Sequence, residues 1–401
     1  MLSQIISFWR GLRDDEHGGY YGYMDFDLQV DKTADKGTIL NSRILWFFSK
    51  AAVILEDSGL LEEARHAYRF LTERCLDKEH GGVYWSVRHD GAPADTTKHT
   101  YNQAFAIYAL SAYYQATGDL SARSLIIDIY CLIETHCADK YGYIEAFSRD
   151  FKPVPNDKLS ENGVMADKTM NTLLHLAEAY ASYVEAETPQ KKYSIGAVSD
   201  SLRHILDIFL QKVYNSELHR NEVFFDAEMA PLKRDGRAFD LHSYGHDIEA
   251  SWLLDWAASL AAPLDLPLDD DEVSPPDLAR TVRGATGALA ENVYQRAFHN
   301  RSLWNECENG RPDETRVWWV QAEGVVGFVN AYQRTGDPRF FRAAEEMLEY
   351  IQTYLVDKRP GSEWFWDVDG NGAPSSGKPI VEPWKCPYHN GRMCLEILRR
   401  G

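Results

Sequence analysis

The strongest constraint on the fold is a repeated pattern of turn residues and aromatic residues between long helical segments. Stretches of this kind are HGGYYGYMDFD from His17, HGGVYWSVRHDG from His80, KYGYIEAFSRD from Lys140, GSEWFWDVDGNG from Gly361 and a less regular copy, NEVFFDAEMAPL, from Asn221. Turn formers next to aromatic residues predict a small hairpin in each stretch. A motif that returns at intervals indicates an architecture built from repeats.

Between these stretches, apolar residues recur at spacings of three and four, which is typical of helices that bury one face. About twelve helices are expected, at residues 1–13, 38–55, 60–76, 101–118, 121–137, 167–187, 198–215, 241–261, 274–298, 317–336, 338–357 and 387–400. Two of the connections are alike, AYYQATGD and AYQRTGD. In them, Gly118 and Gly336 are expected to end one helix directly before the next begins.

A single helix pair cannot bury its apolar faces alone, so the pairs must pack on one another. About six pairs can close into an inner ring of helices inside an outer ring, with short connections on one rim and the hairpin loops on the other. An open solenoid is disfavoured because neither end of the chain carries a polar capping repeat. The sequence therefore predicts an all-α (α/α)6 barrel that forms a single domain over residues 1–401, with the acidic, proline-rich stretch 263–277 as a surface loop.

Charge and cysteine content narrow the class of partner. The chain has 42 Lys and Arg against 61 Asp and Glu, a net charge of −19, which disfavours binding to nucleic-acid phosphates. The N-terminal segment has neither a cationic start nor a long apolar run, so we expect no signal peptide and no membrane span. Six scattered cysteines without a CxxC pair are typical of reduced thiols, which predicts a cytoplasmic protein.

The aromatic content points to a sugar ligand. The chain has 11 Trp, 22 Tyr and 17 Phe, and flat aromatic faces stack on the C–H faces of sugar rings. Large helical proteins also use aromatic residues as core, so any single Trp fits either interpretation. The content alone favours a neutral, small-molecule ligand over a charged one.

Polar residues in alternate helices, those expected to form the inner ring, are the unusual feature of the sequence. Asn171 and His175 are four residues apart, and His246 and Glu249 are three apart, so each pair shares a helix face. The other candidates are Arg43, Trp318, Trp319, Glu323, Trp384 and His389. Each alone is as well explained as a structural residue. Together, they would converge on one cavity if the barrel closes, which predicts a functional site.

Metal and cofactor motifs are absent from the sequence. There is no HExxH, and GHDIE offers one histidine with acids at neighbouring positions, a poor ligand set. No GxGxxG dinucleotide motif occurs either. We therefore expect a site that works without a metal or a cofactor.

Four segments carry a family resemblance: KGTILNSRILWFFSKA, SYGHDIEASWLL, WWVQAEGVVGF and FWDVDGNG with PWKCPYHNGRM. They resemble the N-acylglucosamine 2-epimerase superfamily, and within it the cellobiose 2-epimerases, nearly from end to end and in the family's order. The resemblance implies an (α/α)6 barrel and epimerisation at C2 of the reducing-end sugar of a β-1,4-linked disaccharide such as cellobiose. It implies no cofactor and leaves a monomer or a weak dimer open.

The resemblance also implies roles for individual residues. His246 and His389 resemble the acid/base pair, and Glu249 resembles the carboxylate that supports His246. The pocket-lining and sugar-holding positions are matched by His175, Asn171, Arg43 and Tyr101, and the aromatic walls by Trp319, Trp384 and, less closely, Trp318. Members of the family often have a further histidine where this chain has Leu173. His175 is retained nearby, so we expect no loss of catalysis.

The residue types suggest a division of labour between the histidines. His389 follows Pro387 at a helix start, where neutral imidazole is favoured and can act as a base. His246 has Glu249 one turn away, which favours the protonated form and suits an acid. Arg43 is expected to stabilise the oxyanion that develops on the sugar.

Other functions stay open at this point. An aldose–ketose isomerase, or an epimerase of monosaccharides or N-acyl sugars, would use the same scaffold. A glycoside hydrolase would need two opposed carboxylates, for which Glu249, Glu323 and Asp247 are the candidates. A sugar-binding scaffold without activity would leave the paired histidines unexplained.

Overall fold

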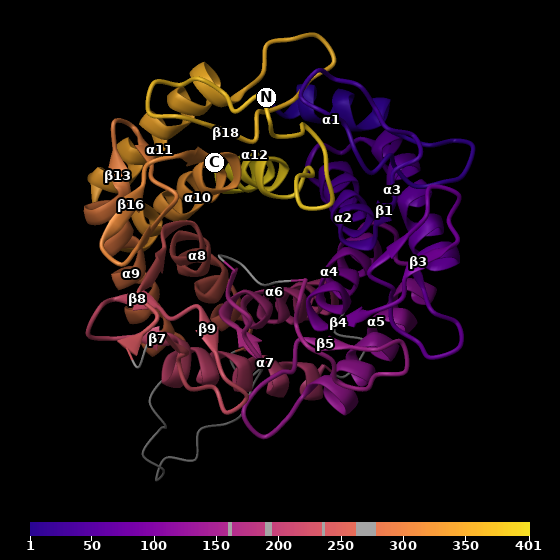
Figure 1. The fold of residues 1–401 in the computed structure, drawn as a ribbon, viewed down its shortest axis with the longest axis horizontal. Coiled ribbons are helices and arrows are strands. Elements are labelled where there is room, and N and C mark those ends of the chain that lie inside the picture. The colour runs from indigo at the N-terminus through magenta and orange to yellow at the C-terminus, as the bar shows by residue number, and fades with distance from the viewer. Residues whose placement is uncertain (159–162, 189–194, 235–236, 262–277) are drawn as a thin grey trace.

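The computed structural model describes residues 1–158, 163–188, 195–234, 237–261 and 278–401. Within them, the helices form two concentric rings around a central axis (Figure 1). The inner ring consists of α2 (Thr38–Ile54), α4 (Thr100–Thr117), α6 (Met170–Glu187), α8 (Tyr244–Ala261), α10 (Trp318–Thr335) and α12 (His389–Arg400). The outer ring consists of α1 (Leu2–Gly11), α3 (Ser58–Phe70), α5 (Leu120–Leu132), α7 (Gly196–Ile208), α9 (Leu278–Ala297) and α11 (Pro338–Tyr350).

Consecutive inner helices pack side by side, and α12 contacts both α10 and α2, so the ring is closed. Each of α2, α4, α6, α8 and α10 also packs on the outer helix that follows it. The predicted (α/α)6 barrel is confirmed. The stretch 263–277, expected as a surface loop, lies outside the described residues, as do the first four residues of the helix predicted at 274–298.

The two glycines of the matched connections end their helices as predicted. Gly118 has φ 71° and Gly336 has φ 73°, the left-handed conformation that ends a helix and that glycine adopts without strain. The next residues, Asp119 and Asp337, cap the following helices through their carboxylates, which accept the amides of Ser121 and Arg339.

Four outer helices end in a single π-helical turn, which the predicted helix ends had included. These turns are η1 (Leu71–Cys75), η2 (Ile133–Cys137), η4 (Phe209–Val213) and η5 (Ile351–Leu355). The apolar spacing continues through each turn, so periodicity alone does not reveal where the α-helical hydrogen bonds stop.

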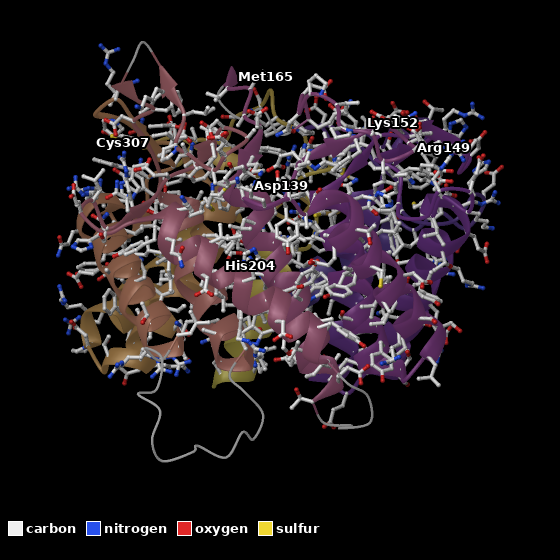
Figure 2. All side chains as sticks on the ribbon, turned by 90° about the horizontal axis from the view of Figure 1, so that it is seen from below. Asp139, Arg149, Lys152, Met165, His204 and Cys307 are labelled. Carbon is white, nitrogen blue, oxygen red and sulfur yellow. The ribbon has the colours of Figure 1, made fainter. Side chains whose placement is uncertain are left out.

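Short antiparallel strands gather at one rim, where the long loops lie (Figure 2). They are β1 (Lys36–Gly37), β2 (Ser86–Val87), β3 (Pro93–Asp95), β4 (Lys98–His99), β5 (Ala146–Phe147), β6 (Lys168–Thr169), β7 (Tyr214–Asn215), β8 (Arg220–Asn221), β9 (Phe224–Phe225), β10 (Lys233–Arg234), β11 (Arg237–Ala238), β12 (Leu241–Ser243), β13 (Phe298–His299), β14 (Ser302–Leu303), β15 (Glu306–Glu308), β16 (Arg311–Asp313), β17 (Arg316–Val317) and β18 (Asp367–Val368). Several pair neighbouring repeats, as β1 does with β2, β4 with β5, β6 with β9 and β17 with β18.

These strands correct three predicted helix starts. The helices predicted from residues 167, 241 and 317 begin at Met170, Tyr244 and Trp318, because the preceding residues belong to β6, β12 and β17. All the residues of these strands except Val317 are buried, like the helix residues that follow them. A fourth start also moves, since the last helix begins at His389, two residues after Pro387.

Three inner helices each begin two residues after a buried lysine that forms an ion pair. Lys36, Lys98 and Lys168 each stand two residues before a helix, in β1, β4 and β6. Their Nζ atoms lie 2.5, 3.0 and 2.6 Å from carboxylate oxygens of Asp14, Asp77 and Asp139, which follow the preceding outer helices. Each ion pair ties an inner helix N-terminus to the neighbouring repeat.

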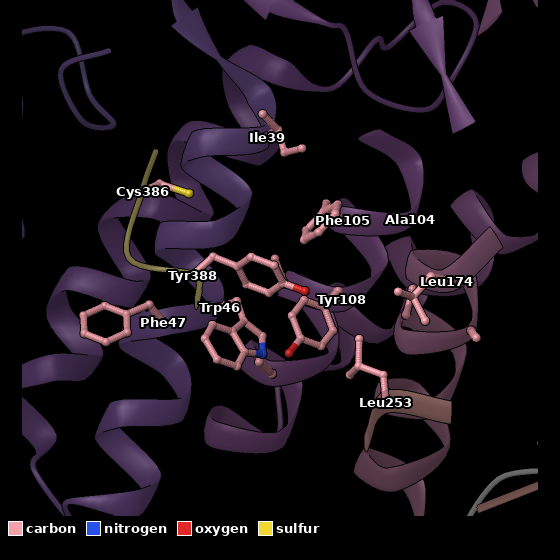
Figure 3. Packing of buried hydrophobic residues seen from close by; sticks show 14 of the residues in the cluster. Ile39, Trp46, Phe47, Ala104, Phe105, Tyr108, Leu174, Leu253, Cys386 and Tyr388 are labelled. Carbon is pink, nitrogen blue, oxygen red and sulfur yellow. The ribbon is translucent and has the colours of Figure 1, made fainter. Parts of the chain in front are cut away.

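Large aromatic residues pack against one another inside the ring of helices (Figure 3). Trp46 of α2 stacks on Tyr108 of α4 with ring centroids 5.2 Å apart, and Tyr388 meets Trp46 edge to face at 5.8 Å. These aromatic contacts lie between the two ends of the barrel interior.

No helix among the described residues is long and apolar enough to cross a bilayer.

Candidate active site

A cavity of about 280 Å³ lies at the hairpin end of the barrel. Its lining includes ten of the eleven candidate residues, namely Arg43, Tyr101, Asn171, His175, His246, Glu249, Trp318, Trp319, Trp384 and His389, while the eleventh, Glu323, contacts His389 without lining the cavity. Two further residues, Lys158 and Trp366, come from loops of the same rim. The predicted convergence on one cavity is therefore what the structure shows.

The helix residues of this set stand in the first two turns of the inner helices. Tyr101 and Asn171 are the second residues of α4 and α6, and His389 is the first of α12. Inner helices thus direct their N-termini, with the positive end of the helix dipole, toward the cavity. This arrangement favours negative charge on a ligand.

His389 is held by a carboxylate from the neighbouring helix. Its Nδ1 lies 2.8 Å from Oε1 of Glu323. Because a carboxylate accepts, Nδ1 carries the proton and Nε2 keeps a lone pair. Burial and the nearby Arg392 guanidinium lower the pKa of His389 well below its ordinary value, so the ring is neutral. A neutral imidazole was expected here, and burial is its main cause; its role as a base stays a prediction.

His246 has a different partner from the one predicted. Its Nδ1 lies 2.7 Å from the hydroxyl of Ser243 in β12, and Glu249 makes no hydrogen bond with it. Burial lowers the pKa of His246 to about 4, so the ring is neutral rather than protonated. The prediction that Glu249 supports a charged His246 is wrong, because side chains three apart on α8 turn to different neighbours. A hydroxyl both donates and accepts, so Ser243 supports either tautomer.

Glu249 turns toward the barrel axis. One of its oxygens accepts from Arg392 Nη2 and lies 3.8 Å from Nδ1 of His389. Burial and the adjacent Glu323 raise the pKa of Glu249 to about 8. This carboxyl therefore carries a proton at neutral pH.

His175 has a carboxylate of its own. Its Nδ1 lies 2.8 Å from Oε2 of Glu178, which also accepts from the hydroxyl of Tyr388 at 2.6 Å. Burial lowers the pKa of His175 to about 4. Like His389, it presents a neutral Nε2 lone pair, here suited to accept a sugar hydroxyl.

Arg43 is a buried cation without an acidic partner. Its Nη2 donates to the hydroxyl of Tyr101 at 2.9 Å and its Nη1 to the carbonyl of Trp384 at 3.3 Å. The guanidinium lies over the ring of Phe105, 4.2 Å from its centroid. Within the described residues, it forms no ion pair with a carboxylate, although it is only 2% exposed. Its charge is therefore available to a ligand oxyanion.

Tryptophans form the walls of the cavity. The ring of Trp319 lies 4.9 Å from His246 and 5.4 Å from His389, between the two histidines. Gly245 makes this position accessible, since a Cβ there would lie 2.4 Å from the Trp319 ring. Trp384 stands across the cavity at 5.8 Å from Tyr101, while Trp318 is almost fully buried against His389.

Comparisons with known proteins agree with this site. The family model described as N-acylglucosamine 2-epimerase matches residues 18–390. The chain belongs to this family. It is 51% identical to a cellobiose 2-epimerase of Eubacterium cellulosolvens, over 100% of this chain and 97% of that protein.

Solved structures place this family member among sugar epimerases. A sugar epimerase from a ruminal bacterium matches with a TM-score of 0.90 and 46% identity, over 99% of this chain and 96% of that one. A cellobiose 2-epimerase from Bacillus thermoamylovorans matches with a TM-score of 0.89 and 41% identity, over 100% and 97%. The resemblance inferred from the four sequence segments is confirmed.

One group in this N-acylglucosamine 2-epimerase family member has the composition of a metal site. Ligand atoms of Glu249, Glu323 and His389 lie within 4.8 Å of one another. Arg392 already donates to both carboxylates from Nη2, so a guanidinium supplies the positive charge there. A metal ion would have to displace it, and these residues therefore do not fit a resident metal.

Several functional residues escaped the sequence analysis. Glu178 has the same His–x–x–Glu spacing from His175 that made Glu249 a candidate, so a signal was available. Arg392 and Tyr388 lie within the segment PWKCPYHNGRM but were given no role. Lys158 and Trp366 stand in loops, where no helix periodicity marks a direction.

Proposed function

We propose that this chain is a cellobiose 2-epimerase, which interconverts glucose and mannose at the reducing end of β-1,4-linked disaccharides. The observation that carries the proposal is a pair of neutral imidazoles, His246 and His389, at one cavity with an unpaired arginine, Arg43. The relatives that are at least 41% identical over the whole chain and named as cellobiose 2-epimerases support the same activity.

The proposed reaction begins with the open-chain aldose, whose C1 carbonyl makes the C2 proton acidic. Nε2 of His389 removes this proton, the C2–H electron pair forms the enediolate, and the imidazolium is stabilised by Glu323 through Nδ1. The negative charge on the enediolate oxygens faces Arg43 and the helix N-termini. No redox partner is needed, since the proton leaves and returns at the same carbon.

Reprotonation on the opposite face completes the inversion. His246 takes a proton from solvent and donates it from Nε2 to C2 while Ser243 accepts from Nδ1; the His246 ring is then neutral again, and His389 returns its own proton to solvent. In the reverse direction, the neutral Nε2 of His246 is the base and His389 is the acid, with Ser243 and Glu323 each accepting from Nδ1 of its histidine.

Aromatic walls suit the disaccharide. Trp319 and Trp384 offer faces for the apolar sides of the sugar rings, with Trp366 and Lys158 at the loop-bearing mouth. A hydrolase would need two carboxylates on opposite sides of the bond that it cleaves. Among the described residues that line the cavity, Glu249 is the single acid, and Asp247 instead pairs with His242 at 2.8 Å.

We also propose a cytoplasmic location and one catalytic domain that acts without a cofactor, as a monomer or weak dimer. The six cysteines are unpaired thiols, which suits a reducing compartment. All the inner helices contribute to the cavity, so no part of the ring would form the site alone.

The test is NMR of cellobiose incubated with the protein in D2O. Epimerisation gives the mannose-ended disaccharide with deuterium at C2, and both properties should persist after dialysis against EDTA. Free glucose would show a hydrolase, and a ketose-ended disaccharide as the main product would show an isomerase. An unchanged sugar would contradict the proposal.

A further inference from the structure

A single buried arginine links the carboxylates beneath the sugar cavity. Arg392 of α12 is 1% exposed. Its Nη1 donates to Glu178 and to the hydroxyl of Tyr388, and its Nη2 donates to Glu249 and, at 2.6 Å, to Glu323. The residue does not line the cavity, so any effect on the reaction must pass through these partners.

Both histidine–carboxylate pairs meet at this guanidinium. Glu178 holds Nδ1 of His175, and Glu323 holds Nδ1 of His389, each at 2.8 Å. One planar cation thus fixes two carboxylates, and each carboxylate fixes the ring orientation and tautomer of one histidine. The forked shape of the guanidinium is needed because Nη1 donates to Glu178 of one pair and Nη2 donates to Glu323 of the other.

The charges of this cluster balance best when one of its carboxyl groups carries a proton. Three carboxyl groups surround one guanidinium, and a buried net charge of −2 with neutral histidines would be costly. Glu323 accepts from Arg392, from His389 and from Trp252 Nε1 at 2.9 Å, whereas Glu249 accepts from Arg392 alone. Glu323, which accepts more hydrogen bonds, stays ionised, so the proton resides on Glu249.

The titratable and charged groups around Glu249 come from several elements. They are Tyr108 of α4, His175 and Glu178 of α6, His246 on its own helix α8, Glu323 of α10, and Tyr388, His389 and Arg392 at the start of α12. Arg392 holds the pKa of Glu178 at about 2 against the opposing effect of burial, so this carboxyl is ionised. The cluster therefore contains two carboxylates, one neutral acid and one cation.

We propose that Arg392 is a positioning residue for the epimerase reaction, which couples His175 to His389 by holding Glu178 and Glu323 in place, next to a Glu249 that burial and the neighbouring carboxylates keep as a neutral acid. The kinetic consequences of this inference rest on the proposed function, because they are measured on the epimerase reaction. The protonated Glu249 is a property of the protein itself and is measured without turnover.

The kinetic test uses Arg392→Lys and Arg392→Ala in the full chain, with folding checked by circular dichroism and thermal melting. Lysine keeps the charge but cannot bridge both sides. We expect kcat on cellobiose to fall at least about tenfold in each variant, with KM within about threefold because Arg392 does not touch the sugar. Guanidinium ion added to Arg392→Ala should restore part of kcat. Arg316→Lys, at another buried arginine that lines no cavity, is the matched control and should keep kcat.

The pH profile separates positioning from a general loss of stability. Wild-type kcat should change around pH 8 as Glu249 ionises. In Arg392→Ala, this step should move to higher pH, because the cation that favours the carboxylate is gone. A wild-type profile in both variants, or a KM effect without a kcat effect, would overturn the proposal.

The wild-type protein provides a test that is independent of folding in the arginine variants. The infrared difference spectrum of wild type minus Glu249→Gln at pH 7 should contain the carbonyl band of a protonated carboxylic acid, and this difference band should be lost above pH 9; the difference removes the contribution of Glu145, a second buried carboxyl whose pKa is raised to about 7. Absence of the band would overturn the charge assignment even if the protein epimerises cellobiose. Presence of the band in a protein inactive on cellobiose would instead reject the proposed function alone.

Discussion

The same inner helices enclose a cavity at each end of the barrel, and only one of the two has the chemistry of an active site. The second, which we call the far cavity, has a volume of about 350 Å³. It is lined by Trp46, Lys50, Val53, Ile54, Tyr108, Gln115, Ser182, Glu185, Thr188, Trp252, Trp256, Leu260, Leu395, Glu396 and Arg399. Both cavities are thus rich in aromatic residues. Tyr388 lies between them, because it contacts Trp46 and Tyr108 of the far cavity and His175 of the site.

The difference lies in how the charged groups are satisfied. In the far cavity, Lys50 pairs with Glu185 at 3.2 Å and Arg399 with Glu396 at 2.7 Å. At the hairpin end, Arg43 has no carboxylate partner among the described residues, and histidines present neutral nitrogens. Helix C-termini surround the far cavity and N-termini the site, so only the site favours a developing anion. Aromatic lining and volume therefore do not identify the active site, whereas unpaired charge and free lone pairs do.

The largest expected effect is the loss of either catalytic histidine. His246→Ala or His389→Ala should lower epimerisation by about a thousandfold or more, since one base cannot both remove and replace the C2 proton. Starting from the glucose epimer, His246→Ala keeps the base and should still exchange the C2 proton for deuterium. Starting from the mannose epimer, His389→Ala should do so.

The measurement is NMR of C2 deuterium incorporation in both variants and from both epimers, with folding verified. His204 is an exposed histidine on α7, and His204→Ala is the control expected to behave as wild type. Near wild-type epimerisation by both single variants would show that the two histidines are structural.

The next prediction compares Arg43, which has no carboxylate partner among the described residues, with the paired Arg399 of the far cavity. Arg43→Met should lower kcat about a hundredfold, because the enediolate loses its cationic partner. Arg399→Met in the far cavity removes an arginine that is already paired and should change kcat less than about twofold. Steady-state kinetics on cellobiose measures both. Equal losses in the two variants would remove the distinction drawn between the cavities.

Much of this arrangement was predictable from the sequence. Helix periodicity and the repeated hairpin segments indicated a closed ring of helix pairs, and the glycines at 118 and 336 marked two helix ends. Polar residues on apolar helices stood out because burial of such groups is costly without a purpose. Since these residues lie on successive inner helices, closure of the ring alone brings them together.

The partners of those residues were not predictable. His246 and Glu249 share a helix face, yet small differences in side-chain direction send one to Ser243 and the other to Arg392. Glu323 reaches His389 from a helix far away in sequence, and spacing within one helix carries no information on such a contact. The helix starts shifted for a related reason: short strands and inner helices bury the same kinds of residue at this rim.

The aromatic walls should give a smaller effect than the charged groups. Trp319→Ala or Trp384→Ala is expected to raise KM for cellobiose about tenfold, through loss of stacking on the sugar. A fall in kcat as well would indicate that the wall orients C2. Trp256→Ala in the far cavity should leave KM within about twofold. Unchanged kinetics in both wall variants would show that these residues serve the core.

The smallest expected effect is that of mild acid, and it tests burial of the histidines directly. Burial lowers the pKa of His246 and His175 to about 4, so a neutral base persists as the pH falls toward that value. Between pH 7 and pH 5.5, kcat/KM should therefore change less than about twofold, whereas an imidazole of ordinary pKa near 6.5 would lose about tenfold. The double variant Lys50→Met, Glu185→Gln in the far cavity should give the same profile, because those groups take no part in the reaction. An acid limb centred near pH 6.5 would mean that the two imidazoles are as well solvated as ordinary ones, and the contrast between neutral buried histidines and a charge-paired far cavity would fail.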